Sequence, residues 1–177
     1  IGHYPTGRPA DPDLAKDSAR YMDIPITPAY AFGHGLSYAA FEYGGLTLSS
    51  ETLAPGGRVT ISAAVTNTSG VDADEVVQLY VRDPVAQVAR PQQELRGFAR
   101  VAIPAGETRR VAFTLAPEQF AYFAPSGQFE ADAGRIDFGI GAGSADIRLT
   151  GSFRLTAPIV VAGPAAAMAT PVTVSEE

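Results

Sequence analysis

The stretch that decides the fold is Arg58–Thr66, which reads RVTISAAVT. Apolar side chains occupy every second position from Val59 to Val65, and polar side chains fill most of the positions between them. This alternation is typical of a strand with one face in a core and the other in water. Turn residues flank the stretch at Pro55–Gly57 and Asn67–Gly70. The stretch therefore predicts a β-strand.

The same pattern recurs along the chain and predicts an all-β domain. The longer predicted strands are Glu75–Asp83, Arg109–Leu115 and Arg135–Ile140, and the shorter ones are Leu46–Leu48, Phe98–Val101, Ile147–Leu149 and Phe153–Leu155. About seven such strands separated by glycine-containing turns favour an immunoglobulin-like or fibronectin type III-like antiparallel sandwich, with a closed barrel as the alternative. The absence of cysteine and tryptophan favours the fibronectin-like branch. The one helix-like signal is a single turn at Ala116–Phe120.

Composition excludes several classes of function. The chain has 177 residues and a net charge of −6, which makes nucleic acid a poor partner. No apolar run reaches the ~18 to 20 residues of a membrane-spanning helix. The two histidines, His3 and His34, lie far apart without metal-ligand spacing, so no metal or other cofactor is expected. The chain does not begin with methionine, which we interpret as the sign of a piece of a longer protein.

Residues 1–42 are predicted to be an extended segment without a core of its own. Five prolines interrupt its first 28 residues, yet many large apolar side chains are present, so the segment is expected to pack against another surface. In the stretch Ala29–Phe41, aromatic residues surround two glycines. The candidate contact residues are Tyr30, Phe32, His34 and Tyr38. Contact with a neighbouring domain is favoured over sugar binding, with His34 as a candidate contact at the rim of a sugar site.

Catalytic motifs are not found. Ser37 lacks the surroundings of a nucleophile elbow, and the glycines at 139, 141 and 143 alternate within a strand pattern. The carboxylates of Asp72–Glu75 and Glu130–Asp132 fall in turns, where solvated charges are expected. Residues 43–156 are therefore interpreted as a non-catalytic module. Residues 157–177 form an Ala/Pro/Val-rich tail whose composition is typical of disorder and whose role is open.

Several ordered motifs resemble the C-terminal part of glycoside hydrolase family 3, most closely the bacterial β-glucosidases. In the first segment they are Tyr4 with Thr6–Pro9, then Ser18–Asp23, then Pro28–Tyr38 (PAYAFGHGLSY). In the second they are Val77–Asp83 (VQLYVRD), Arg90–Pro91 with Glu94–Phe98 (ELRGF), and Pro104–Glu107. This second group resembles the family's terminal fibronectin type III-like domain.

The resemblance implies that a barrel domain and an α/β domain precede this region, and that residues 1–42 are the exit segment of the α/β domain. The whole enzyme would remove terminal β-D-glucosyl residues with retention, using two carboxylates that both lie upstream of Ile1. No catalytic residue transfers to this chain, whose expected partner is the catalytic part of the same enzyme, on the same or a separate chain. The substrate of that enzyme is expected to be a β-glucoside or an oligosaccharide.

Three further expectations complete the interpretation. Arg90 and Arg96 are candidates for ion pairs with carboxylates across the junction between domains. Related enzymes are often periplasmic or secreted, which is the expected location here. The alternative hypothesis is an independent carbohydrate-binding or adhesion sandwich, which would bind sugar by itself.

Overall fold

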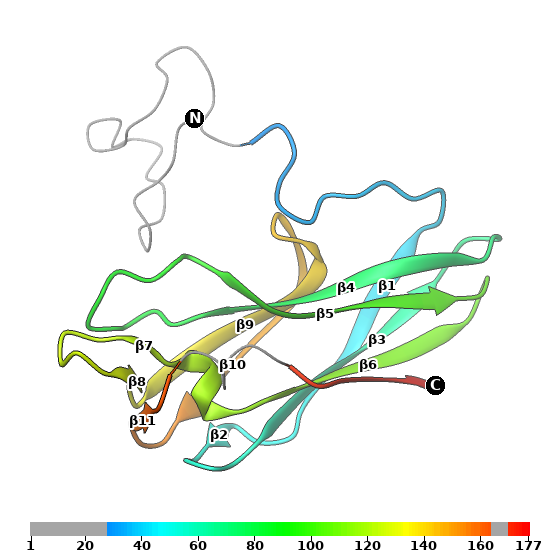
Figure 1. The fold of residues 1–177 in the computed structure, drawn as a ribbon. Coiled ribbons are helices and arrows are strands. Elements are labelled where there is room, and N and C mark those ends of the chain that lie inside the picture. The colour runs from blue at the N-terminus through cyan, green and yellow to red at the C-terminus, as the bar shows by residue number, and fades with distance from the viewer. Residues whose placement is uncertain (1–27, 164–169) are drawn as a thin grey trace.

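The computed structural model describes residues 28–163 and 170–177. The predicted features within residues 1–27, which include His3 and the motifs from Tyr4 to Asp23, lie outside the described residues. From Phe41 onward, the regular secondary structure of the described residues is β-strand apart from one short 3-10 helix (Figure 1).

Two sheets face each other across the core. The strands are β1 (Phe41–Leu48), β2 (Thr52–Leu53), β3 (Val59–Asn67), β4 (Ala73–Arg82), β5 (Glu94–Ile103), β6 (Thr108–Leu115), β7 (Tyr122–Phe123), β8 (Phe129–Ala131), β9 (Gly134–Gly143), β10 (Asp146–Leu155), β11 (Ile159–Val161) and β12 (Val172–Glu176). The 3-10 helix η1 (Pro117–Phe120) follows β6. One sheet has the order β1-β3-β6-β12, the second β2-β10-β9-β4-β5, and a small third sheet β11-β8-β7. This arrangement confirms the predicted sandwich over the barrel.

The strand pairing explains why the alternating sequence pattern predicts this fold. β3 lies between β1 and β6 and pairs antiparallel with both, so Val59, Ile61, Ala63 and Val65 all face the second sheet and are fully buried. Alternate residues of β6 add to this face, and alternate residues of β4, β9 and β10 supply the opposing apolar side chains from the second sheet. Pairing is antiparallel throughout the described residues except for two residues of β2, which run parallel to β10.

In β4 the alternation is confirmed, but the expectation of a solvent-exposed second face is wrong at the middle of the strand. Gln78 and Tyr80 point away from the core and are nevertheless buried, at 4% and 3% exposure. Gln78 is covered because the chain around Gly33 and the end of β9 at Ala142 both lie against this face, and the Tyr80 hydroxyl bonds to Gln78. The outer face of the second sheet is therefore the place where the preceding segment meets the sandwich.

Two parts of the 157–177 tail form strands. β11 pairs with β8, and β12 adds to β6 as the edge strand of the first sheet. Thr170 fastens the start of the last segment, because its hydroxyl donates to the Arg96 carbonyl and accepts from Gln119 Nε2. Arg96 belongs to β5 and Gln119 to η1, so this contact joins the tail to the second sheet and to the short helix. The predicted division at residues 42/43 and 156/157 stays a prediction.

Candidate docking surface

Residues 28–40, here called the arm, cross the outer face of the second sheet before the chain enters β1 (Figure 1). The arm has no regular secondary structure apart from a turn closed by the His34 amide, which donates to the Ala31 carbonyl over 3.0 Å. Gly33 sits in this turn at φ +78°, a conformation that residues with a Cβ rarely adopt. The turn brings two backbone carbonyls toward the sandwich.

The arm is attached to the sandwich through its backbone. The Phe32 carbonyl accepts a hydrogen bond from the Ser144 amide over 2.9 Å. The Gly33 carbonyl accepts a longer one from Gln78 Nε2 over 3.4 Å, and Gln78 Nε2 also donates to the Ala142 carbonyl over 2.6 Å. Because backbone atoms make these contacts, the side chains of the arm are left to point elsewhere.

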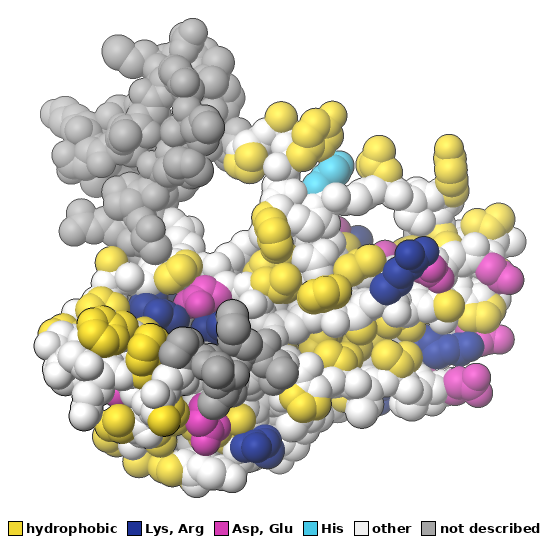
Figure 2. Space-filling view, viewed as in Figure 1, with side chains coloured by type: hydrophobic (Ala, Val, Ile, Leu, Met, Phe, Trp, Pro, Cys, Tyr) yellow, Lys and Arg dark blue, Asp and Glu magenta, His cyan; other side chains and the backbone are white. Residues whose placement is uncertain are grey.

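The large side chains of the arm are exposed. Tyr30 is 75% exposed, Phe32 67%, Leu36 93% and Tyr38 106%. Figure 2 shows apolar side chains along the arm and on the surface beneath it, beside the single histidine in view. We call these four residues, with Val76 of β4 and Phe98 of β5, which are also exposed, the docking surface. Apolar groups gathered in this way mark interaction sites more often than ordinary surface.

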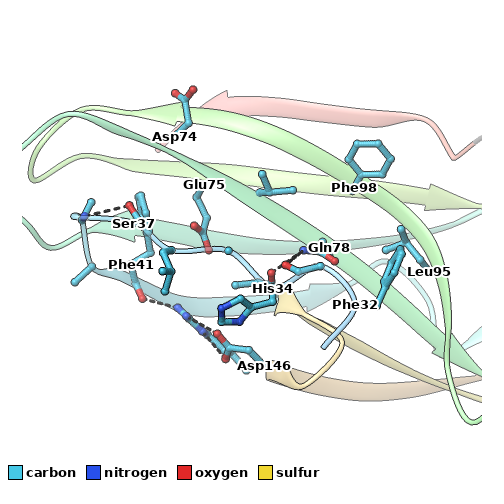
Figure 3. Close-up of a pocket in the computed structure, with 18 residues that line it drawn as sticks. Phe32, His34, Ser37, Phe41, Asp74, Glu75, Gln78, Leu95, Phe98 and Asp146 are labelled. Carbon is cyan, nitrogen blue, oxygen red and sulfur yellow. Dashed lines mark hydrogen bonds and ion pairs between the residues drawn. The ribbon is translucent and has the colours of Figure 1, made fainter. Parts of the chain in front are cut away.

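A groove of about 750 Å³ runs between the arm and the outer face of the sheet. Its apolar lining comes from Phe32 and Leu36 of the arm and from Val76, Leu95 and Phe98 of the sheet. Its polar lining includes His34, Glu75 and Asp146, and Figure 3 shows the Glu75 side chain extending from β4 toward the arm. The groove has the size of small-molecule sites, and it opens onto the docking surface.

The polar wall of the groove is a linked set of charged and aromatic groups. Glu75 is buried and accepts a hydrogen bond of 2.7 Å from the Tyr43 hydroxyl. Arg148 lies over the Tyr43 ring at 4.7 Å from its centroid and pairs with Asp146 at 2.8 Å. Burial and the bond to Glu75 raise the pKa of Tyr43 far above its ordinary value, while the hydrogen bond from Arg148 lowers the pKa of Asp146. Tyr43 therefore stays a neutral hydrogen-bond donor to Glu75.

A second group of charges holds the connection between β4 and β5. Arg90 and Arg96 each bind one oxygen of Glu94, at 2.6 and 2.8 Å, and all three side chains are mostly buried. Arg90 also lies 5.1 Å from the centroid of the Tyr122 ring. Within the described residues, the Nε atoms of both arginines are buried and have no hydrogen-bond partner. Burial raises the pKa of Asp83, at the start of this connection, and lowers that of Arg96.

The structure separates the six predicted site residues into two groups. Tyr30, Phe32, His34 and Tyr38 lie together on the arm, where the His34 ring contacts the Tyr30 ring at a centroid distance of 5.2 Å. Arg90, in the connection between β4 and β5, and Arg96, near the start of β5, lie apart from these and share a carboxylate of their own chain. The roles of all six stay predictions.

Three residues that matter for this surface were not predicted from the sequence. Gln78 holds the arm, Glu75 forms the wall of the groove, and Phe98 exposes its ring beneath the arm. In the sequence, Gln78 occupies a polar position of an alternating strand, which normally faces water. Glu75 instead stands in the same alternation as Val77 and Leu79, where an apolar residue facing the core is expected. For Phe98, the sequence offered one indication, an aromatic residue at a strand position where the alternation leads one to expect a polar side chain.

Across residues 28–163 and 170–177, no group of three or more His, Asp or Glu side chains is arranged to hold a metal ion. In the same part of the chain, no helix is long and apolar enough to cross a membrane.

Comparisons with known proteins assign the sandwich. The family of fibronectin type III-like domains (Fn3-like) matches residues 75–144. The periplasmic beta-glucosidase of Salmonella typhimurium strain LT2 is 37% identical over 154 residues, which cover 86% of this chain and 20% of that protein. An exo-alpha-(1->6)-L-arabinopyranosidase of Bifidobacterium longum is 42% identical over 119 residues, covering 67% of this chain and 15% of that protein.

Solved structures agree. The beta-glucosidase of Listeria innocua, crystallised in complex with isofagomine, superposes with a TM-score of 0.77 at 31% identity and covers 88% of this chain and 22% of that one. The chain thus spans about a fifth of the length of such relatives.

The protein is a fibronectin type III-like β-sandwich preceded by an exposed aromatic arm. The chain corresponds to the C-terminal part of a glycoside hydrolase family 3 enzyme similar to bacterial β-glucosidases, which confirms the resemblance found in the sequence.

Proposed function

We propose that this chain is the non-catalytic C-terminal portion of a family 3 β-glucosidase and that it stabilises the catalytic domains by binding them through the docking surface. The observation that carries this proposal is the exposure of Tyr30, Phe32, Leu36 and Tyr38 on an arm whose backbone is held in place. Large apolar side chains that stay exposed to water do not stabilise the isolated chain, whereas aromatic side chains commonly anchor interfaces. The partner is the N-terminal catalytic part of the same enzyme.

The whole enzyme is proposed to remove terminal β-D-glucosyl residues with retention, using carboxylates of the preceding domains. Relatives that match this chain carry different names, a beta-glucosidase in one case and an arabinopyranosidase in the other. The shared part is therefore not expected to select the sugar. One of these relatives is named as periplasmic, and we propose a periplasmic or secreted location.

Within this proposal, residues 1–42 connect the domains, residues 43–156 form the sandwich and residues 157–177 close its edge. The segment Asp83–Arg96, which comprises the connection between β4 and β5 and the start of β5, is proposed to lie against the preceding domains and to support the rim of the active site. A carboxylate from those domains would have to compete with Glu94, which already binds both arginines. We therefore assign the arginines first to shaping this connection and only second to pairing across the junction.

A second candidate function is supported by the groove. Its volume of about 750 Å³ and its mixture of aromatic and polar lining, with His34 at one side, would suit a sugar unit. On this alternative the chain is a carbohydrate-binding or adhesion module that binds oligosaccharide without any catalytic domain.

One comparison separates the two candidates. The 177-residue chain and a longer polypeptide that includes the preceding domains are titrated with β-linked gluco-oligosaccharides by calorimetry, and unfolding of the sandwich is followed in both. The stabilising role predicts no saturable binding to the short chain and a more stable sandwich in the longer polypeptide. Saturable binding to the short chain that His34→Ala abolishes, with equal sandwich stability in both, would favour the alternative.

A further inference from the structure

The arm meets the sandwich at one buried polar residue that the docking surface does not include. Gln78 projects from β4 on the outer face of the second sheet and is almost completely buried. Its Nε2 atom donates to the Ala142 carbonyl over 2.6 Å and to the Gly33 carbonyl over 3.4 Å. Its Oε1 atom accepts from the Tyr80 hydroxyl over 2.6 Å. Every polar atom of this amide is thus engaged, which fixes its orientation.

The approach of the arm to Gln78 depends on a glycine. A Cβ atom built on Gly33 would lie 2.3 Å from Gln78 Oε1 and 2.8 Å from Nε2, and the φ of +78° independently disfavours any other residue. A neighbouring contact depends on a second glycine, because a Cβ on Gly143 would lie 3.2 Å from the Gly33 carbonyl oxygen. The chain therefore passes closely over Gln78 because glycines stand on both sides of the contact.

The contact directs the rest of the arm. Two consecutive carbonyls, those of Phe32 and Gly33, point at the sandwich and are bound by Ser144 and Gln78. With the carbonyls turned inward, the Phe32 ring stays 67% exposed and the residues on either side of the turn project their side chains outward. Figure 3 shows Gln78 beneath the turn, with His34 and Phe32 on either side of it.

We propose that Gln78 is a positioning residue for the interface between domains: together with Ser144 it holds the Phe32–Gly33 turn, here called the latch, and so orders the arm before the catalytic domains bind. This inference rests on the proposed docking function and names the residue that orders the arm for docking. A segment without secondary structure loses conformational freedom when it binds, and ordering it in advance reduces that cost. In this proposal Gln78 acts through the arm and is assigned no contact of its own with substrate or partner.

The chain offers a matched pair of variants to test the latch. Gly33→Ala places a methyl group against the Gln78 amide, whereas Gly35→Ala, two residues further along the same arm, meets nothing within 4 Å and has an ordinary φ. Both change an exposed glycine to alanine outside the core. Gln78→Met provides a third variant, which keeps a similar side-chain length but removes the donor to both carbonyls.

The first readout is amide hydrogen exchange at Ser144 in the 177-residue chain, measured by NMR. The latch predicts that exchange of this amide is about tenfold faster or more in Gly33→Ala and in Gln78→Met, as expected for loss of one or two hydrogen bonds, and unchanged in Gly35→Ala. Exchange in β3 should be the same in wild type and Gly33→Ala, which shows that the sandwich itself is intact. Equal Ser144 exchange in Gly33→Ala and Gly35→Ala would overturn the latch.

The second readout is the stability of the sandwich within the longer polypeptide. Gly33→Ala should lose part of the stabilisation that the preceding domains give, and Gly35→Ala should retain it. If Gly33→Ala speeds hydrogen exchange at the Ser144 amide but leaves this stabilisation unchanged, the latch exists without a positioning role. The proposal for Gln78 is then overturned, whereas the proposed docking function is not. If the longer polypeptide gives the wild-type sandwich no stabilisation, the docking function fails, and the positioning role fails with it even where Ser144 exchange changes.

Discussion

Replacing Tyr38 by alanine should hardly change the stability of the isolated chain but should destabilise the sandwich in the longer enzyme. In the 177-residue chain the Tyr38 side chain is fully exposed, and a substitution there is expected to change the free energy of unfolding by no more than ~0.5 kcal/mol. If the catalytic domains cover this residue, an aromatic side chain removes about 150 Å² or more from water. At about 25 cal/mol per Å², complete burial of about 150 Å² corresponds to ~4 kcal/mol, and truncation to alanine, which keeps the Cβ, should cost ~2 to 3 kcal/mol.

Hydrogen exchange is measured for separate peptides at increasing urea concentrations. Peptides from the sandwich then report the unfolding of the sandwich separately from that of the rest of the enzyme. With a slope of about 1 to 3 kcal/mol per molar urea, a loss of ~2 to 3 kcal/mol lowers the midpoint of the sandwich peptides by roughly 0.7 to 3 M in the longer enzyme. The control is Phe123→Ala, because Phe123 is a 62% exposed aromatic residue on β7, outside the docking surface. The reasoning is refuted if Tyr38→Ala shifts the midpoint equally in both contexts, or no more than Phe123→Ala does.

Three further predictions concern the sandwich itself. Burial raises the folded-state pKa of Asp83, so the contribution of this carboxyl group to stability is present at low pH and is lost as the pH rises through that pKa. Asp83→Asn should therefore gain stability relative to wild type as the pH is raised above the ordinary value of 3.8. Thermal unfolding of both proteins across pH 3 to 8 measures this, and a difference in stability that stays constant with pH would contradict it. Glu94→Gln leaves Arg90 and Arg96 buried beside a neutral amide and should cost about 2 kcal/mol in urea unfolding, whereas an unchanged midpoint would remove the cluster from the account. Thr170→Val removes the hydroxyl that joins the tail to β5 and η1 and should cost ~1 to 2 kcal/mol, with faster exchange in β12; unchanged exchange there would show that the strand pairing alone holds the tail.

The sandwich could be predicted from the sequence because its core strands alternate regularly. Arg58–Thr66 contains the signal in its simplest form, and the structure places a strand at Val59–Asn67. β10 was predicted as two pieces because Gly151 interrupts its alternation. Gly151 stands in mid-strand because a Cβ there would lie 2.4 Å from the Phe138 ring, a packing constraint that depends on another strand and has no local signal.

The docking surface was only partly predictable. The aromatic residues of the arm were noticed because they are too many for a linker, and their exposure in the chain could be anticipated from the lack of a local core. Gln78 could not be found, because a glutamine among alternating residues normally faces water and only the fold shows that Gly33, 45 residues earlier, covers it. The strands at the ends of the tail were missed because their pairing with β6 and β8 is long-range and their composition is that of a disordered segment.

The central claim is that the aromatic side chains of the arm lie at an interface in the whole enzyme. Hydroxyl-radical labelling detected by mass spectrometry measures this directly, because it modifies exposed aromatic and aliphatic side chains in proportion to their accessibility. Tyr30, Phe32 and Tyr38, all exposed in this chain, should be labelled rapidly in the 177-residue protein and at least several-fold more slowly in the longer polypeptide, while Phe123 is labelled alike in both. Equal labelling of the three arm residues in the two proteins would contradict the account.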